Sequence, residues 1–374
     1  MKSERVKNRS SNFELLRMTA MLMIVASHYA AHGIEKATVI DEAYLVWGTG
    51  TVLRRAFTAF LNPGGEVGVA MLFMITGFFQ INREKYSLKK TVLECVYYSA
   101  FAIALCAVGM MTGGIPYMAG WNIAAFLARS VFMPMTSTAW WFVAVYVFLM
   151  LFSPVLNSFL RKLNQKGFLL LLICGGLVWY CLAGFIGTTF FDLQKAVFFY
   201  SIGAYISRFD IGKGISGWIL GMAALLAWTG SAACFYLHGM QILAGSGGGF
   251  ADRVILAVGS DLFVPLCAVT VFLLFRNLPI KQSIFINTAA ATTFGIYLIH
   301  DSLIARPLIW YRWLRVAETQ YFAALFPLLA VLTIVGIYVI CAALDYIRLK
   351  YVEPVMMKKA DKLLQKLKQR FLQS

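Results

Sequence analysis

Ten predominantly apolar stretches, each about the length of a bilayer crossing, limit most what this chain can fold into. A helix needs roughly 20 apolar residues to cross a membrane. Hydrophobic residues make up 60% of the chain and charged residues 13%, against about 25% charged in soluble domains. We therefore predict an all-α, polytopic transmembrane bundle of about ten helices. The expected spans are 14–33, 66–81, 91–111, 139–159, 168–186, 194–207, 215–237, 254–275, 284–304 and 321–347.

The basic residues gather in every second connection between these spans. Segments 1–17, 82–90, 161–166, 208–213, 276–281 and 348–374 hold 24 of the 33 Lys and Arg residues. Lys and Arg accumulate in the cytoplasmic loops of membrane proteins. This distribution predicts a multi-pass protein of the plasma membrane with both termini in the cytoplasm. It also accounts for the net charge of +16 without a nucleic-acid partner.

The sequence predicts one membrane domain with a basic segment at each end. Residues 1–13 form the N-terminal segment, which lacks the pattern of a cleavable signal, and 14–350 form the transmembrane domain. In the tail, 351–374, the Leu and Phe residues of DKLLQKLKQRFL are spaced for an amphipathic helix on anionic lipid. The short segment 121–133 is expected to be an interfacial or re-entrant helix.

The seven cysteines form no CxxC pair and no Cys/His cluster. Isolated cysteines within apolar runs are typical of small buried hydrophobic residues rather than metal ligands or disulfides. We therefore expect no bound metal or cofactor. The cysteines are Cys95, Cys106, Cys174, Cys181, Cys234, Cys267 and Cys341.

The first span carries the densest set of ionisable residues, namely Glu14, Arg17, His28 and His32. Ionisable residues inside a membrane are costly and mark functional sites. Eleven residues are about three helical turns, which places Arg17 and His28 on one face about 16 Å apart. Glu14 and Arg17, at i and i+3, can pair. Alternatively, Arg17 anchors the helix end and the histidines pack in the core or bind a metal, although neither a carboxylate nor a cysteine accompanies them.

Four blocks of this sequence resemble the acyltransferase 3 family of ten-helix membrane enzymes. The most specific are Arg17 and His28, which match the family's R-x10-H signature, and FGIYLIHDSL (294–303), which resembles its late Tyr-Leu-x-His block. GVAMLFMITGFF (68–79) and TAWWFVAVYVFLMLFSP (138–154) resemble two further blocks. In the block 68–79, Thr76 replaces the usual Ser, Leu72 replaces a Phe, and Ala70 stands where Pro or Asp is common. The likeness extends over about residues 10–350.

The resemblance implies roles for particular residues. His28 is expected to act as general base or transient acyl carrier, and Arg17 to bind a phosphate of the acyl-CoA donor at the cytoplasmic mouth. His300 is expected near the outer end of its span, where it orients the acceptor or pairs with Asp301. Gly77 is expected to allow close helix packing, and Trp141 to stack on sugar or belong to an aromatic belt. The supporting residues are Glu14, Thr76, Gly77, Trp141, Tyr297 and His300.

The expected reaction is transfer of an acetyl group from acetyl-CoA to a hydroxyl of a glycan or glycolipid. Succinyl is the alternative acyl group, and acyl-CoA is a substrate rather than a bound cofactor. A polysaccharide or lipid transporter, or a non-catalytic sensor or accessory subunit, remains an alternative function. The chain shows none of the duplicated halves expected of a transporter. We also expect contacts with membrane lipids and with a partner, either a second copy of the chain or a transferase.

Overall fold

The computed structural model describes residues 9–34, 51–83, 87–111, 140–177, 191–302, 305–319 and 325–373. Every regular element within these ranges is a helix, which confirms the predicted all-α class. Five helical segments are long and apolar enough to cross a membrane by length and composition. These candidate spans are Val52–Gln80, Trp141–Lys162, Gly217–Leu243, Phe250–Asn277 and Phe326–Lys366.

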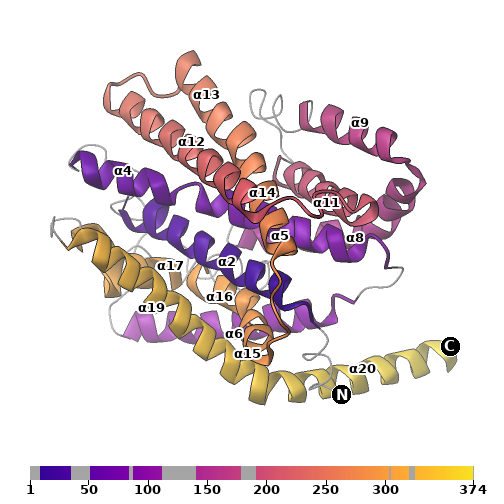
Figure 1. Ribbon diagram of the computed structural model, residues 1–374. Helices are drawn as coiled ribbons and strands as arrows, with labels where there is room; N and C mark the ends of the chain where they lie inside the picture. The colour runs from indigo at the N-terminus through magenta and orange to yellow at the C-terminus, as the bar shows by residue number, and fades with distance from the viewer. Residues whose placement is uncertain are drawn as a thin grey trace.

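Helices α2 (Ser11–His28) and α5 (Gly64–Gln80) lie in the middle of the molecule (Figure 1). A short π-helix, η1 (Tyr29–Ile34), continues α2. Helix α11 (Phe191–Phe209) crosses α5 so closely that a Cβ on Gly77 would lie 1.9 Å from the Tyr200 carbonyl oxygen. On the other side of the crossing, a Cβ on Gly203 would lie 2.0 Å from the Met74 carbonyl oxygen. Small residues let membrane helices approach in this way, which confirms the packing role predicted for Gly77.

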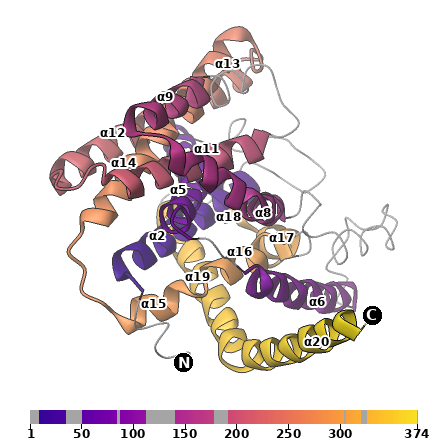
Figure 2. The ribbon, with the colours of Figure 1, turned by 90° about the vertical axis from the view of Figure 1, so that its right-hand side faces the viewer.

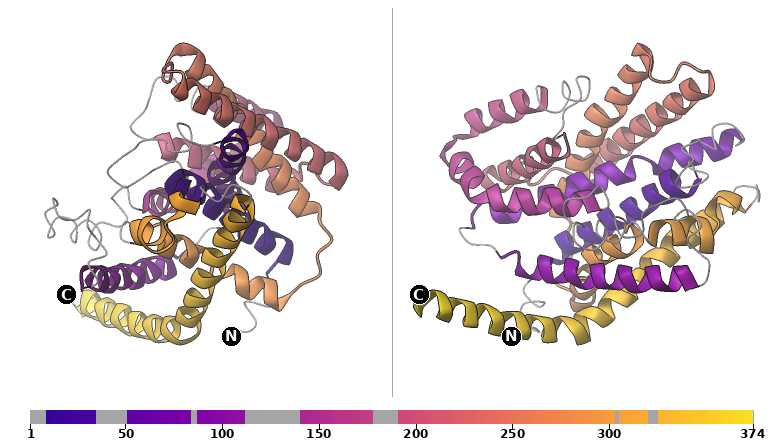
Figure 3. Two further views of the ribbon diagram at one scale, coloured as in Figure 1. Left: turned by 90° about the vertical axis from the view of Figure 1, so that its left-hand side faces the viewer. Right: turned by 180° about the vertical axis from the view of Figure 1, so that it is seen from behind.

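The remaining helices surround this centre (Figures 2 and 3). Their outward faces carry many exposed Leu, Val, Ile and Phe side chains, as expected where lipid is the solvent. The first group is α4 (Val52–Leu61), α6 (Lys89–Met111), α8 (Trp141–Lys162), α9 (Gln165–Gly175), α12 (Gly217–Leu243), α13 (Phe250–Ala257), η5 (Val258–Phe263) and α14 (Val264–Asn277). The second is α15 (Ile284–Ala290), α16 (Thr293–His300), α17 (Ala305–Pro307), η6 (Leu308–Trp313), α18 (Val316–Thr319), α19 (Phe326–Ile347), η7 (Arg348–Val352) and α20 (Glu353–Gln373).

The described parts of all ten predicted spans are mainly helical, but one span is interrupted. The stretch 284–304 breaks at 291–292 into α15 and α16. Thr292 and Thr293 donate their hydroxyls to the carbonyls of Ala289 and Ala290, at 2.7 and 2.9 Å. Such local bonds compete with the helical ladder. The sequence prediction also missed α4. The end of span 168–186 and the segment 121–133 lie outside the described residues.

The guanidinium of Arg348, 2% exposed, joins α19 to its neighbours. It donates to Asp345 at 2.6 Å, to Glu94 of α6 at 2.8 Å and to Glu353 of α20 at 3.3 Å. The Tyr98 hydroxyl donates to the same Asp345 oxygen at 2.5 Å. We call these five residues the Arg348 cluster. Buried charges are tolerated when they are paired and fully hydrogen-bonded, and this pairing is the role that Asp345 has here.

The predicted amphipathic tail is helix α20, which bends away from α19 and runs beside α6 (Figures 2 and 3). Lys89 at the start of α6 forms an ion pair with Asp361 of α20. Leu363 and Leu364 of the tail are exposed. Helix α20 is therefore joined to the bundle by an ion pair, and its leucine side chains remain exposed.

Candidate active site

A cavity of about 590 Å³ lies beside α2, inside the bundle. Residues of α2, α5, α6, α8, α11 and α16 line it. Ligand pockets typically measure about 300–1,000 Å³ and combine apolar walls with a few polar groups. The wall here is mainly apolar and aromatic, and the charged residues lie towards its ends. Its size and lining suit a small organic substrate.

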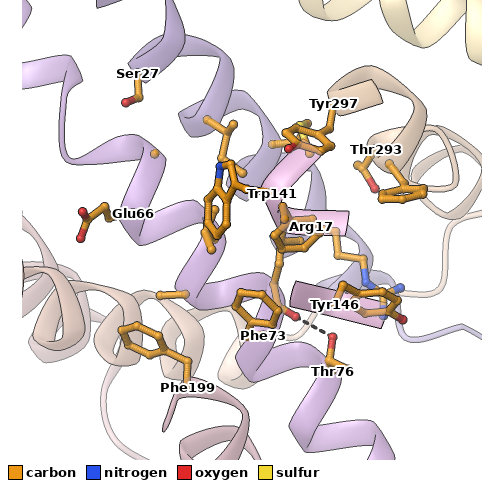
Figure 4. Close-up of a pocket in the computed structure, with 18 of the residues that line it drawn as sticks. Arg17, Ser27, Glu66, Phe73, Thr76, Trp141, Tyr146, Phe199, Thr293 and Tyr297 are labelled. Atoms are coloured by element: carbon orange, nitrogen blue, oxygen red, sulfur yellow. Dashed lines mark hydrogen bonds between the residues drawn. The ribbon is translucent and has the colours of Figure 1, made fainter. Parts of the chain in front are cut away.

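The two ends of the cavity differ in charge. Helices α2 and α5 run antiparallel, because the Phe13 and Phe78 rings lie 4.9 Å apart while Ser27 donates to the Asn62 carbonyl at 2.9 Å. The basic Arg17 end therefore lies opposite an end with mixed charge, the Glu66 end (Figure 4). The Arg17 end carries Arg9, Arg17 and Lys90, with Glu94 one turn beyond Lys90, and the Glu66 end carries Glu66, Asp192 and Lys195.

A carboxylate holds Arg17 in place. Glu14, whose side chain is 5% exposed, accepts a hydrogen bond from Arg17 at 2.5 Å and lies 3.5 Å from Arg9. The pairing predicted from the i, i+3 spacing is therefore confirmed. Arg17 remains about one third exposed and reaches the cavity, so its other donors are available to a ligand.

His28 is bonded directly to His300, a residue 272 positions away in the sequence. Nδ1 of His28 lies 2.9 Å from Nε2 of His300, and Nδ1 of His300 lies 2.6 Å from the Ile296 carbonyl oxygen. A carbonyl can only accept, so Nδ1 of His300 carries the hydrogen. In two neutral rings, Nε2 of His300 then accepts from Nδ1 of His28. Nε2 of His28 is thereby left as an unprotonated nitrogen.

A buried carboxylate, Asp301, lies beside the two histidines of the first helix. Its Oδ1 is 3.6 Å from Nδ1 of His28 and 3.8 Å from Nε2 of His32. Arg306 donates to the same oxygen from Nε at 2.9 Å and from Nη2 at 2.7 Å. Asp301 therefore pairs with Arg306, and His300 pairs with His28.

The sequence argument that no carboxylate accompanies the two histidines is wrong. His28, His32 and Asp301 each offer a ligand atom within 4.8 Å of the others. However, the Asp301 oxygen nearest both histidines already accepts two bonds from a guanidinium. A cation there would lie against the positive charge of Arg306. This donor set favours an ion pair over a metal centre.

Aromatic residues from α8 and α16 form part of the cavity wall (Figure 4). Trp141 of α8 and Tyr297 of α16 both line the cavity. The Tyr297 ring packs against Phe142, with centroids 5.7 Å apart, and against His300 at 6.4 Å. Tyr297 is thus positioned by the same helix that positions His300.

Thr76 and Gly77 differ in how they relate to the cavity. Thr76 lines it, but its hydroxyl donates to the Leu72 carbonyl of its own helix at 2.8 Å (Figure 4). Gly77 is outside the lining and faces α11 instead. Neither residue supplies a free polar group to the cavity, so both support the position of α5.

Sequence reasoning missed several charged residues of this region, among them Arg306, Lys90 and Lys195. Arg306 holds Asp301, while Lys90 and Lys195 line opposite ends of the cavity. Asp301 and Arg306 are five residues apart, a separation with no helical periodicity to indicate a pair. In the sequence, Lys90 is one of the basic residues that accumulate in cytoplasmic loops. The charge pattern alone therefore carried no signal for these roles.

Comparisons with known proteins agree with this geometry. No curated protein and no solved structure matches the chain. The acyltransferase-domain model of the acyltransferase 3 family matches residues 10–345, which is nearly the whole chain and includes every residue of the site named above apart from Arg9. That family comprises acyltransferases, and the apolar helices agree with a multi-pass membrane protein. The chain therefore belongs to the acyltransferase 3 family.

Proposed function

We propose that this protein transfers an acetyl group from acetyl-CoA to a hydroxyl of a glycan or lipid-linked sugar, with His28 as general base. The observation that carries the proposal is the chain from His28 through His300 to the Ile296 carbonyl. It presents one unprotonated imidazole nitrogen in a residue that lines a substrate-sized cavity. Histidine is well suited to proton transfer near neutral pH.

The reaction balances with this single base. Nε2 of His28 takes the proton of the acceptor hydroxyl as its oxygen attacks the thioester carbonyl. The carbon–oxygen bond forms, the carbon–sulfur bond breaks, and the same nitrogen returns the proton to the CoA sulfur. Asp301 lies 3.6 Å from Nδ1 of His28, but the oxygen concerned is already paired with Arg306. No acyl-enzyme is required in this scheme.

The Arg17 end suits the donor. CoA carries a pyrophosphate and a further phosphate, and a guanidinium binds such groups with paired, charge-assisted bonds. Arg17 has Arg9 and Lys90 near it on the cavity wall. The pantetheine arm of the donor then extends about 16 Å along α2 and brings the acyl group to His28. A basic donor mouth agrees with a cytoplasmic location for this end and for both termini, in a plasma-membrane protein.

The Glu66 end suits a polyhydroxylated acceptor. Carboxylates and amines there can bond to hydroxyls, and Trp141 supplies an aromatic face for a sugar ring. An acetyl donor fits the enclosed space between the two ends, with succinyl as the larger alternative. The exposed apolar face of α20, with its lysines, rests on anionic lipid in this proposal. Acceptor hand-over by a partner transferase or a second copy of the chain is compatible with it.

Radiolabelled acetyl-CoA tests the proposal directly. Membranes that contain the wild type should transfer label to glycan, and membranes with His28→Ala should not. His238→Ala is the matched control, because His238 pairs with Asp252 and is absent from the cavity lining. Label transfer by His28→Ala at the wild-type rate would overturn the role of His28. Absence of label with the wild type and all variants would favour a transporter or a non-catalytic subunit.

A further inference from the structure

Tyr297 presents a buried hydroxyl that the reaction scheme above does not use. The residue is 4% exposed, and its hydroxyl has no hydrogen-bond partner among the described residues. Leaving a buried polar group unpaired costs roughly 1–3 kcal/mol, so such groups call for an explanation. Unlike a phenol in a closed core, this one lines the cavity.

The amino end of α8 lies against the same phenol. Helix α8 begins at Trp141, and its N-cap residue Trp140 makes no side-chain capping bond. The first backbone N–H groups of a helix lack partners within the helix, and the helix dipole makes that end positive. Phe142, in the first turn of α8, packs its ring against that of Tyr297, with centroids 5.7 Å apart.

The base and the phenol are fixed by one short helix. Tyr297 and His300 are one turn apart on α16, with ring centroids 6.4 Å apart. His300 in turn bonds His28 at 2.9 Å. His28, Tyr297 and Trp141 all line the cavity, so a carbonyl group attacked beside His28 shares the cavity with Tyr297 and the start of α8.

Acyl transfer creates a need that these groups can meet. When the acceptor oxygen attacks the thioester, the carbonyl electron pair moves onto its oxygen, and the negative charge must be stabilised. Preorganised donors aimed at this oxyanion commonly contribute about 100- to 1,000-fold to turnover. We propose that the Tyr297 hydroxyl and the amino end of α8 form the oxyanion site of this enzyme. The proposal rests on the acyl-transfer function proposed above.

In this site the Tyr297 hydrogen is donated, not transferred. The phenol bonds the oxyanion while the carbon–oxygen bond forms. It remains protonated when the carbonyl re-forms and the carbon–sulfur bond breaks. The proton of the acceptor travels through His28 alone to the CoA sulfur. Tyr297 is thus a catalytic residue with a role separate from that of the base.

A second tyrosine provides the matched control. The Tyr338 hydroxyl on α19 is also buried without a partner among the described residues, but Tyr338 is absent from the cavity lining. Tyr→Phe removes one oxygen atom at either position and keeps the ring. Any general effect of losing a buried hydroxyl therefore appears in both variants, and an effect on the reaction appears only at Tyr297.

The test is steady-state kinetics of purified Tyr297→Phe and Tyr338→Phe with acetyl-CoA and an acceptor glycan. We expect kcat of Tyr297→Phe to fall about 100-fold with the KM for acetyl-CoA within about twofold, and Tyr338→Phe to match the wild type. The proposal is overturned if kcat falls less than about threefold, if only KM rises, or if both variants lose activity equally. A wild type without transfer activity would instead defeat the proposed function. Wild-type transfer that is lost in His28→Ala but kept in Tyr297→Phe defeats the oxyanion site alone.

Discussion

Two groups of buried ionisable residues differ in how completely their hydrogen bonds are satisfied. In the Arg348 cluster, the guanidinium donates hydrogen bonds to three carboxylates, and the Tyr98 hydroxyl donates a further bond to Asp345. In the group around His28, Nε2 of that histidine and the hydroxyl of Tyr297 have no partner among the described residues. The first group is a network of paired charges that joins helices, although its Glu94 also lines the cavity. The second leaves two groups unpaired in residues that line the cavity.

The largest expected effect comes from His28. Its replacement by Ala should reduce acetyl transfer about 1,000-fold or more, because the proton-accepting nitrogen is lost. The thermal unfolding midpoint should change little, since His28 is outside the Arg348 cluster. Transfer rate and unfolding of the detergent-purified protein measure the two quantities. A large loss of stability would show that His28, like Arg348, mainly stabilises the fold, and would contradict the proposed difference between the two groups.

Arg348 should show the opposite pattern. Arg348→Met leaves Glu94 and Asp345 without their cation, while Glu353 keeps Lys90 at 3.6 Å, and should cost about 3–5 kcal/mol of unfolding free energy. Adding Glu94→Gln, Asp345→Asn and Glu353→Gln should recover much of this loss. Denaturant unfolding measures stability. Turnover per folded molecule is compared only between Arg348→Met and the wild type, because Glu94 lines the cavity. Recovery of neither stability nor folded yield would contradict the interpretation as a network of paired charges.

His300 is expected to position the His28 ring without taking part in the reaction itself. His300→Phe removes the acceptor that fixes the His28 ring, and we expect kcat to fall about 100-fold. In His300→Gln the amide oxygen can accept from Nδ1 of His28, so about tenfold should be regained. The KM for acetyl-CoA should not change in either variant. Equal kcat values for Phe and Gln would show that the bond to His28 is not what matters.

The smallest expected effect is at the donor end. Arg17→Lys keeps the charge but loses the planar paired donors, so the KM for acetyl-CoA should rise about tenfold. Glu14 should still hold the new side chain, and kcat should stay within about twofold. Titration of initial rates with acetyl-CoA measures both parameters. A fall in kcat without a change in KM would place Arg17 in the chemistry rather than in donor binding.

The features that sequence could predict are local or periodic. Apolar runs of bilayer length predicted the helices, and the i, i+3 spacing predicted the bond between Glu14 and Arg17. The break at 291–292 was missed because threonine hydroxyls compete with the helix there without interrupting the apolar run.

The contacts that complete the site could not be predicted in this way. His28 and His300 are 272 residues apart, and no property of either segment specifies that they meet. The open hydroxyl of Tyr297 depends on where α8 begins relative to α16. Such features arise from the packing of distant helices, which a single sequence does not encode in any readable spacing.

The direction of the bonds from His28 to Ile296 constrains the order of events during turnover. A ring with one nitrogen committed to His300 has a single lone pair for exchange with substrates. In the direct transfer proposed above, this lone pair accepts the proton of the incoming hydroxyl and then delivers it to the departing sulfur. Both substrates would then meet at the same edge of one imidazole, although they enter from opposite ends of the cavity. The proposed scheme therefore requires a ternary complex on one side of His28.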